Sequence, residues 1–151
     1  MARARRPAAP KAEHLQLEKE VVGLWFEMQG RLQAHFTGVA AEHDLSVVQA
    51  KVLMQLQPEG AATMRTLADQ LQYDSSNLTG VIDRLEDRGI VRRQPDREDR
   101  RVKGVRLTPE GVRLRQAFWN RLTGDTGPLG RLGGEELAAM GNLIRAALAA
   151  P

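Results

Sequence analysis

The chain contains no cysteine, which excludes disulfide bonds, thiolate catalysis, thiol redox sensing and cysteine-ligated zinc. No apolar run approaches the roughly 20 residues that span a bilayer. The basic N-terminus is not followed by the apolar segment of a signal peptide. A soluble, cytoplasmic protein with no membrane partner is therefore expected.

Motifs of enzymes and metal sites are also missing. The sequence has no Gly-rich phosphate loop, no G-x-S-x-G and no H-E-x-x-H. His14, His35 and His43 are scattered, and no carboxylate joins them at metal-ligand spacing. We therefore predict no catalytic site, no metal site and no cofactor.

What the chain does have is an uneven distribution of charge. The net charge is only +3, yet residues 1–12 carry four basic and no acidic side chains, and residues 92–106 carry seven basic and three acidic ones. A basic arm and a basic loop are typical of nucleic-acid binding, because phosphate contacts supply most non-specific affinity. Charge alone leaves open a solvated loop and a disordered terminus.

The 151 residues suffice for one domain, or for a small domain with helical additions. Residues 1–12 are predicted to form a disordered basic arm. A long helix is predicted from about Glu13 to Glu42, because apolar residues recur there at steps of three and four. They form two stripes, so this helix needs two apolar partners, its own domain and a second subunit.

Capping residues place three shorter helices after it. Ser46 with Gln49 three residues later forms a capping box. Thr63 caps a helix over residues 64–71, and Asp74 or Ser75 caps the next helix, which runs to Arg88. Gly89 follows that helix as its natural C-terminal stop.

After Gly89 the spacing of apolar residues changes from the helical period to the alternating pattern of strands. Residues 90–94 and 101–107 predict a hairpin whose long charged loop projects as a wing. Thr108 and Pro109 start another helix. A Gly-rich break leads to a last helix over residues 135–149. This last helix is expected to bury Leu137, Met140, Leu143, Ile144 and Leu148.

The helix after residue 74 has the pattern of a DNA-reading helix. Leu78, Val81, Ile82 and Leu85 recur at helical spacing and bury one face, while the opposite face holds small polar residues. That combination suits the major groove, because large apolar groups would block the base edges. The order of elements predicts a mainly α fold with a small β-hairpin wing, a winged helix-turn-helix flanked by N- and C-terminal helices.

From Leu45 to Gly111 the chain resembles the MarR (multiple antibiotic resistance) family of bacterial regulators. The wing motif Asp-x-Arg, five residues, Leu-Thr-x-x-Gly is met by Asp99, Arg101, Leu107, Thr108 and Gly111. The resemblance implies a transcriptional regulator, a repressor in preference to an activator. It would bind pseudo-palindromic double-stranded DNA as a homodimer, and a small aromatic or anionic effector would release it.

The resemblance also implies roles for single residues. Arg101 would enter the minor groove and Asp99 would hold it by a charged hydrogen bond, with Arg97 and Arg100 serving instead or in addition. Thr108 and Gly111 would be structural, as a cap and a close-packing position. The residues expected at the DNA are Arg65, Thr66, Ser75, Ser76, Asn77, Thr79, Gly80, Arg84, Arg93, Arg97, Asp99, Arg100, Arg101 and Lys103.

The resemblance further implies that residues 13–44 and 109–151 are N- and C-terminal dimerisation helices and that residues 45–108 form the winged helix-turn-helix DNA-binding domain. Trp25, Met28, Phe118 and Trp119 would line an effector pocket or form a plain aromatic core. Two alternative functions stay open. One is an architectural or weakly specific DNA-binding protein without an effector, and the other is a winged helix that binds protein.

Overall fold

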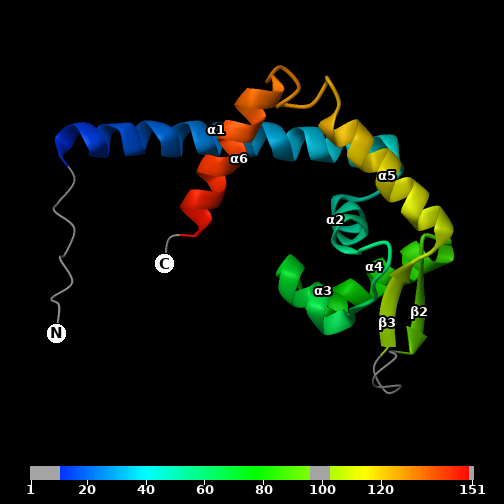
Figure 1. Ribbon diagram of the computed structural model, residues 1–151. Coiled ribbons are helices and arrows are strands. Elements are labelled where there is room, and N and C mark those ends of the chain that lie inside the picture. Colours follow the sequence, from blue (N-terminus) through cyan, green and yellow to red (C-terminus); the bar gives the residue numbers. More distant parts are fainter. Residues whose placement is uncertain (1–10, 96–102, 150–151) are drawn as a thin grey trace, which may run out of the picture.

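The computed structural model describes residues 11–95 and 103–149, most of which lie in helices or in one small antiparallel sheet (Figure 1). This confirms the predicted mainly α fold with a small β-wing. The elements are α1 (Ala12–Glu42), α2 (Val47–Gln55), β1 (Ala62–Thr63), α3 (Met64–Leu71), α4 (Ser75–Asp87), β2 (Val91–Pro95), β3 (Lys103–Leu107), α5 (Pro109–Thr123) and α6 (Gly134–Leu148).

The predicted caps are present at the starts of three helices. The Ser46 hydroxyl accepts from the Gln49 N–H at 3.2 Å, and the Gln49 side chain accepts from the Ser46 N–H at 2.8 Å. The Thr63 and Thr108 hydroxyls each accept from the N–H three residues later, at 3.0 and 3.1 Å. Gly89 has φ +68°, the left-handed conformation that terminates helices. These local predictions are confirmed. The predicted cap of α4 is not, because the Asp74 side chain, directly before that helix, makes no capping hydrogen bond with the described residues.

The sheet has one strand more than the predicted hairpin. Its order is β1-β3-β2, and Ala62 and Thr63 of β1 pair with Val105 and Gly104 of β3. A two-residue strand carries no alternating pattern, so the sequence does not reveal it. Arg106 reinforces this edge, because its guanidinium donates to the carbonyl of Glu59 at 2.7 Å just before β1.

One hydrophobic core holds together the winged body, the name used below for α2, α3, α4 and the three-stranded sheet. Leu53, Leu67, Leu78 and Leu85 from α2, α3 and α4 are fully buried. Phe118 of α5 is buried with them, and its ring meets that of Phe36 edge-on, with centroids 5.2 Å apart. The recognition helix α4 is therefore packed into the body along one face.

Two arginines tie the end of α1 to this body. Arg88, at the C-terminus of α4, donates to the carbonyls of Asp44 at 2.6 Å and His43 at 3.2 Å. Arg121 of α5 binds both carboxylate oxygens of Glu42, at 2.7 and 2.8 Å. Glu42 at the end of α1 is thus bound to α5, and the two residues after it are bound to the end of α4.

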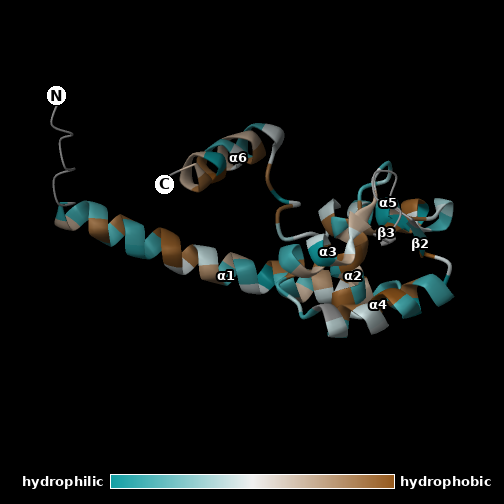
Figure 2. Cartoon of the chain, turned by 90° about the horizontal axis from the view of Figure 1, so that it is seen from below, coloured by the Kyte–Doolittle hydropathy of each residue, from teal (hydrophilic) through white to brown (hydrophobic). Residues whose placement is uncertain are grey.

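Helix α6 differs from its expected burial. Met140 and Ile144 are half-buried, but Leu137, Leu143 and Leu148 are exposed, the last two by 73% and 80%. The expectation that all five residues turn inward is wrong within one chain. The physical reason is position, since α6 is set apart from the winged body, on the side to which α1 projects (Figures 1 and 2).

Candidate DNA-binding interface

The turn between α3 and α4 sets the direction of α4. Gln72 adopts the left-handed conformation, with φ 54°, and the N–H of Tyr73 donates to the Ala68 carbonyl at 3.0 Å. Only residues 72–74 separate the two helices. A connection this short fixes the second helix against the first, which is the arrangement of a helix-turn-helix.

The two faces of α4 differ sharply. Leu78, Ile82 and Leu85 are fully buried, as the spacing predicts. The opposite face is exposed and includes Ser76, Asn77, Thr79, Gly80 and Arg84, with Asp83 and Asp87 toward its C-terminal end. A Cβ atom at Gly80 would meet nothing within 4 Å. The face thus offers hydrogen-bonding groups with little bulk, which suits base edges.

Arg65 and Thr66 lie in the first turn of α3. The Arg65 side chain is 92% exposed, and its Nε is 4.0 Å from Asp69, a spacing that holds the guanidinium only weakly. The Thr66 hydroxyl is also exposed and lies 2.9 Å from the Thr63 hydroxyl. Both residues are thus exposed in the first turn of α3, the helix that precedes α4.

Arg93 is placed differently from the other predicted DNA contacts. Its guanidinium binds Asp83 at 2.7 Å and Glu86 at 2.6 Å, and its side chain is 24% exposed. Arg93 lowers the pKa of Glu86. The main cause is the hydrogen bond from the Arg93 backbone N–H, and the hydrogen bond from its side chain adds to it, while burial acts in the opposite direction. Burial lowers the pKa of Arg93, but the bonds to Asp83 and Glu86 outweigh it and the pKa is raised.

The wing tip lies outside the described residues, and with it Arg97, Asp99, Arg100 and Arg101. The side chains of Ser75 and Lys103 are outside them too. The described root of the wing is a regular antiparallel pair from Val91↔Leu107 to Pro95↔Lys103.

The structural roles of Thr108 and Gly111 are confirmed. The Thr108 hydroxyl donates to the Gly89 carbonyl at 2.6 Å while it caps α5. A Cβ atom at Gly111 would lie 2.0 Å from the Ile90 carbonyl oxygen. This close approach joins the end of the wing to the end of α4, and only glycine permits it.

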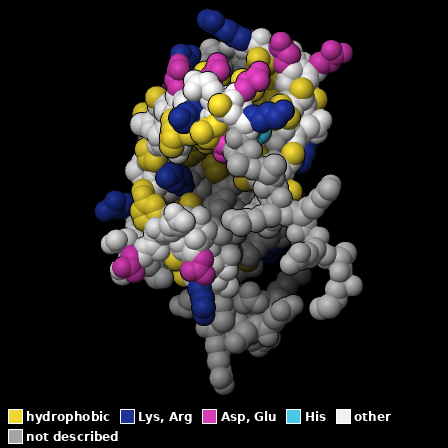
Figure 3. All heavy atoms as spheres, turned by 90° about the vertical axis from the view of Figure 1, so that its left-hand side faces the viewer, with side chains coloured by type: hydrophobic (Ala, Val, Ile, Leu, Met, Phe, Trp, Pro, Cys, Tyr) yellow, Lys and Arg dark blue, Asp and Glu magenta, His cyan; other side chains and the backbone are white. Residues whose placement is uncertain are grey.

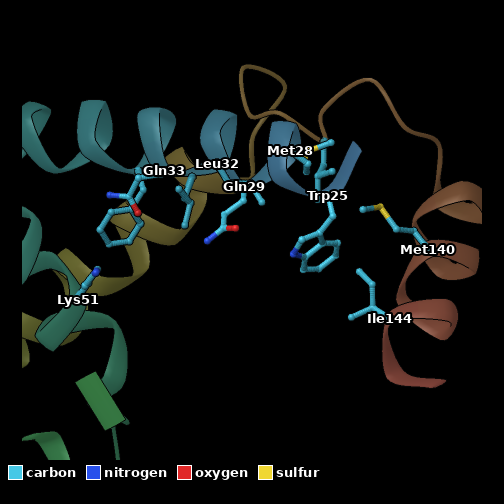
Figure 4. Close-up of a pocket in the computed structure, with 11 residues that line it drawn as sticks. Trp25, Met28, Gln29, Leu32, Gln33, Lys51, Met140 and Ile144 are labelled. Carbon is cyan, nitrogen blue, oxygen red and sulfur yellow. The ribbon is translucent and has the colours of Figure 1, made fainter. Parts of the chain in front are cut away.

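A cavity of about 490 Å³ lies between α1, α2, α5 and α6 (Figure 4). Trp25 and Met28, both predicted pocket residues, line it. Phe118 instead belongs to the core, and Trp119 does not appear in the lining. Lys51 is the one charged residue among the lining residues.

Sequence reasoning missed Lys51, Met140 and Ile144 at this cavity. The spacing of four between Met140 and Ile144 marks one helix face, but nothing in the sequence indicates which element that face meets. Figure 4 shows the two side chains of α6 directed toward Trp25 of α1.

Around this cavity, large apolar side chains are exposed. Figure 3 views the molecule from the side to which α1 projects, and on this face hydrophobic side chains gather around a hollow. On α1 they include Val21 and Phe26, the latter 67% exposed, and on α6 they include Leu143. Contiguous exposed apolar surface of this kind marks an interaction site.

The described residues contain no group of three His, Cys, Asp or Glu side chains that could hold a metal ion. Within the same part of the chain, no helix is long and apolar enough to cross a membrane.

Comparison with known proteins gives one consistent result. A model of the MarR family matches residues 45–103. The HTH-type transcriptional regulator PapX of Escherichia coli is 30% identical over 117 residues, which cover 78% of this chain and 67% of PapX. The regulator YfiV of Bacillus subtilis (strain 168) is 36% identical over 78 residues, 52% of this chain. The match covers 49% of YfiV, about half the length of that relative.

The structure of CouR from Rhodococcus jostii RHA1 bound to p-coumaroyl-CoA is also similar. Its sequence identity is 30% and its TM-score 0.69, over 87% of this chain and 91% of CouR. The match therefore extends beyond the winged body to the flanking helices. Members of the matching family regulate transcription and are not enzymes. The winged body, the short turn that leads into the polar-faced helix α4 and these similarities lead to one conclusion: the chain belongs to the MarR family of DNA-binding transcriptional regulators.

Proposed function

We propose that this chain is a repressor that binds a pseudo-palindromic operator as a homodimer and leaves it when a small aromatic or anionic effector binds. The observation that carries the proposal is the exposed polar face of α4, held rigidly by a buried opposite face. Residues 45–108 would read DNA, residues 13–44 and 109–151 would form the dimer, and the basic arm would add phosphate contacts.

In this proposal α4 enters the major groove. Ser76, Asn77 and Thr79 offer hydrogen-bonding groups to base edges from its first turns, and Arg84 reaches from the same exposed face. Arg65 and Thr66, with Ser75 at the start of α4, contact phosphates beside the groove. In the wing, Arg101 enters the minor groove with Asp99 as its support, and Arg97, Arg100 and Lys103 add positive charge.

The homodimer is supported by the exposed apolar side chains of α1 and α6. Exposing this much apolar surface is unfavourable for a free monomer, and a second copy would cover it. Twofold symmetry then requires two half-sites about 10 bp apart, one turn of DNA.

The effector is supported by the cavity between the proposed dimerisation helices and the winged body. Its lining is mostly apolar, with Lys51 to attract an anion. CouR, similar to this chain over most of its length, was solved with p-coumaroyl-CoA, which has an aromatic body and negative charge. A ligand there would act by binding more tightly to a dimer whose recognition helices have the wrong spacing for the operator.

Selection of bound fragments from random duplex DNA tests the proposal. We expect a symmetric site with half-sites about 10 bp apart, and a linear loss of log affinity with log salt. Equal binding to scrambled duplexes would instead indicate an architectural DNA-binding protein. No salt-dependent binding to duplex DNA would indicate a winged helix that binds protein.

Two wing variants test the roles at the tip. Arg101→Ala should lose about 1–3 kcal/mol of binding to the selected site. Asp99→Ala should also weaken binding, although it removes a negative charge near phosphate. Unchanged affinity for the first variant, or improved affinity for the second, would remove these assignments.

A further inference from the structure

The recognition helix and the wing are joined by a cluster of three charged residues, Asp83, Glu86 and Arg93. Asp83 and Glu86 are three residues apart on α4, so both carboxylates lie on one side of the helix. Arg93 comes from β2, and each of its two Nη atoms binds one of these carboxylates, at 2.7 and 2.6 Å. The cluster therefore bridges α4 and the root of the wing.

Glu86 also binds the backbone of the wing. Its Oε1 accepts from the Arg93 backbone N–H at 2.8 Å, while its Oε2 accepts from the Arg93 guanidinium. β2 is an edge strand, since the sheet order is β1-β3-β2. On this open edge no neighbouring strand supplies an acceptor for the Arg93 N–H, and the Glu86 carboxylate accepts its hydrogen bond instead.

These contacts engage both Nη atoms of Arg93, so few of its donor groups remain for a DNA phosphate. A phosphate would have to compete with two carboxylates, each of which binds one Nη atom of the guanidinium at hydrogen-bond distance. Two carboxylates on a helix that approaches DNA are, moreover, unfavourable for affinity, because they repel phosphate. Their presence is explained if they serve to hold the wing.

We infer that Arg93 is a positioning residue and not a phosphate ligand, and that Asp83, Glu86 and Arg93 fix the wing to the recognition helix so that both meet the DNA as one unit. The inference rests on the proposed function, and it deepens that function by separating the arginines that touch DNA from the one that does not. Glu86 is the central member, because it holds both the side chain and the backbone of Arg93.

Glu86→Gln in the full chain tests this inference, because two effects predict opposite signs. If only long-range charge mattered, removing a negative charge near DNA would tighten binding. If Glu86 positions the wing, the neutral amide cannot keep the ion pair, and affinity for the selected duplex should fall about 5- to 20-fold. Asp87→Asn is the matched control, since Asp87 is the next acidic residue and forms no ion pair with the described residues. It should bind at least as tightly as the parent.

Arg93→Gln gives an independent measurement through the salt dependence of binding. A residue that neutralises one phosphate contributes about 0.9 to the slope of log affinity against log salt. We expect Arg93→Gln to weaken binding and leave this slope unchanged, and Arg93→Lys to fall between the parent and Arg93→Gln.

Hydroxyl-radical footprinting separates positioning from general loss of folding. Glu86→Gln should lose minor-groove protection beside the site and keep the protection of the half-site bound by α4. Tighter binding by Glu86→Gln, or a slope reduced by about 0.9 in Arg93→Gln, would overturn the inference and leave the proposed function standing. A parent chain that binds no duplex would overturn the proposed function itself.

Discussion

Gly80 lies in the middle of α4 on its exposed face, and a Cβ atom there would meet nothing within 4 Å. The fold therefore gives no reason for glycine at this position. Glycine in a helix interior costs about 0.8–1 kcal/mol relative to alanine. Gly80→Ala should raise the free energy of unfolding by about that amount and raise Tm by about 2–4 °C.

Binding to DNA should change in the opposite direction. If the Gly80 backbone approaches the base edges, an added methyl group meets DNA that cannot move away without losing neighbouring contacts. By analogy with overpacked protein cores, the cost is about 1–3 kcal/mol, roughly a 5- to 150-fold loss of affinity. The predicted variant is thus more stable and binds DNA less tightly.

Thermal unfolding at a fixed protomer concentration and titration of the selected duplex measure the two effects. Gly38→Ala is the control, because Gly38 lies in α1, away from the DNA-binding elements, and its Cβ would also meet nothing within 4 Å. It should gain similar stability and keep full affinity for DNA. If Gly80→Ala bound the duplex as tightly as the parent, close approach of α4 at this position would be refuted.

Three further predictions concern stability. Gly111→Ala should lower the free energy of unfolding by at least about 1–3 kcal/mol, because its Cβ would lie 2.0 Å from the Ile90 carbonyl oxygen; unfolding in urea measures the loss. Phe118→Ala should cost about 3–5 kcal/mol in the same assay, since the ring is fully buried. The side-chain hydrogen bond from Arg121 holds the pKa of Glu42 below 4.5, its ordinary value. The ion pair should therefore stabilise the fold above that pH and be lost below it, so the stability difference between the parent and Glu42→Gln should shrink as pH falls from 5 to 3.

Much of the fold follows from short-range patterns. Ser46 with Gln49, Thr63, and Thr108 with Pro109 mark three helix starts, and the structure has helices at all three. Each of these caps joins residues three apart, so the interaction is complete within a single turn of chain. The buried stripe of α4 is of the same kind, because helical spacing alone places its members on one face.

The residues of the candidate site also differ in whether short-range patterns predict their positions. Helical spacing places Ser76, Asn77 and Gly80 together on the exposed face of α4, and the structure agrees. Arg93 lies in a basic stretch of the sequence, and that local charge alone predicts a DNA contact. Its pairing with Asp83 and Glu86 appears only when β2 has folded back against α4.

The sequence by itself determines that this chain has neither thiol chemistry nor a motif for catalysis. It also determines, through periodicity, a recognition helix with one polar face, followed by a basic wing. Tertiary structure alone decides that β1 joins the sheet, that Lys51 and α6 meet α1 at one cavity, and which arginine is held by carboxylates. The physical reason is range: a helix cap is satisfied by its own neighbours, whereas an ion pair or a cavity needs elements that only the packed core brings together.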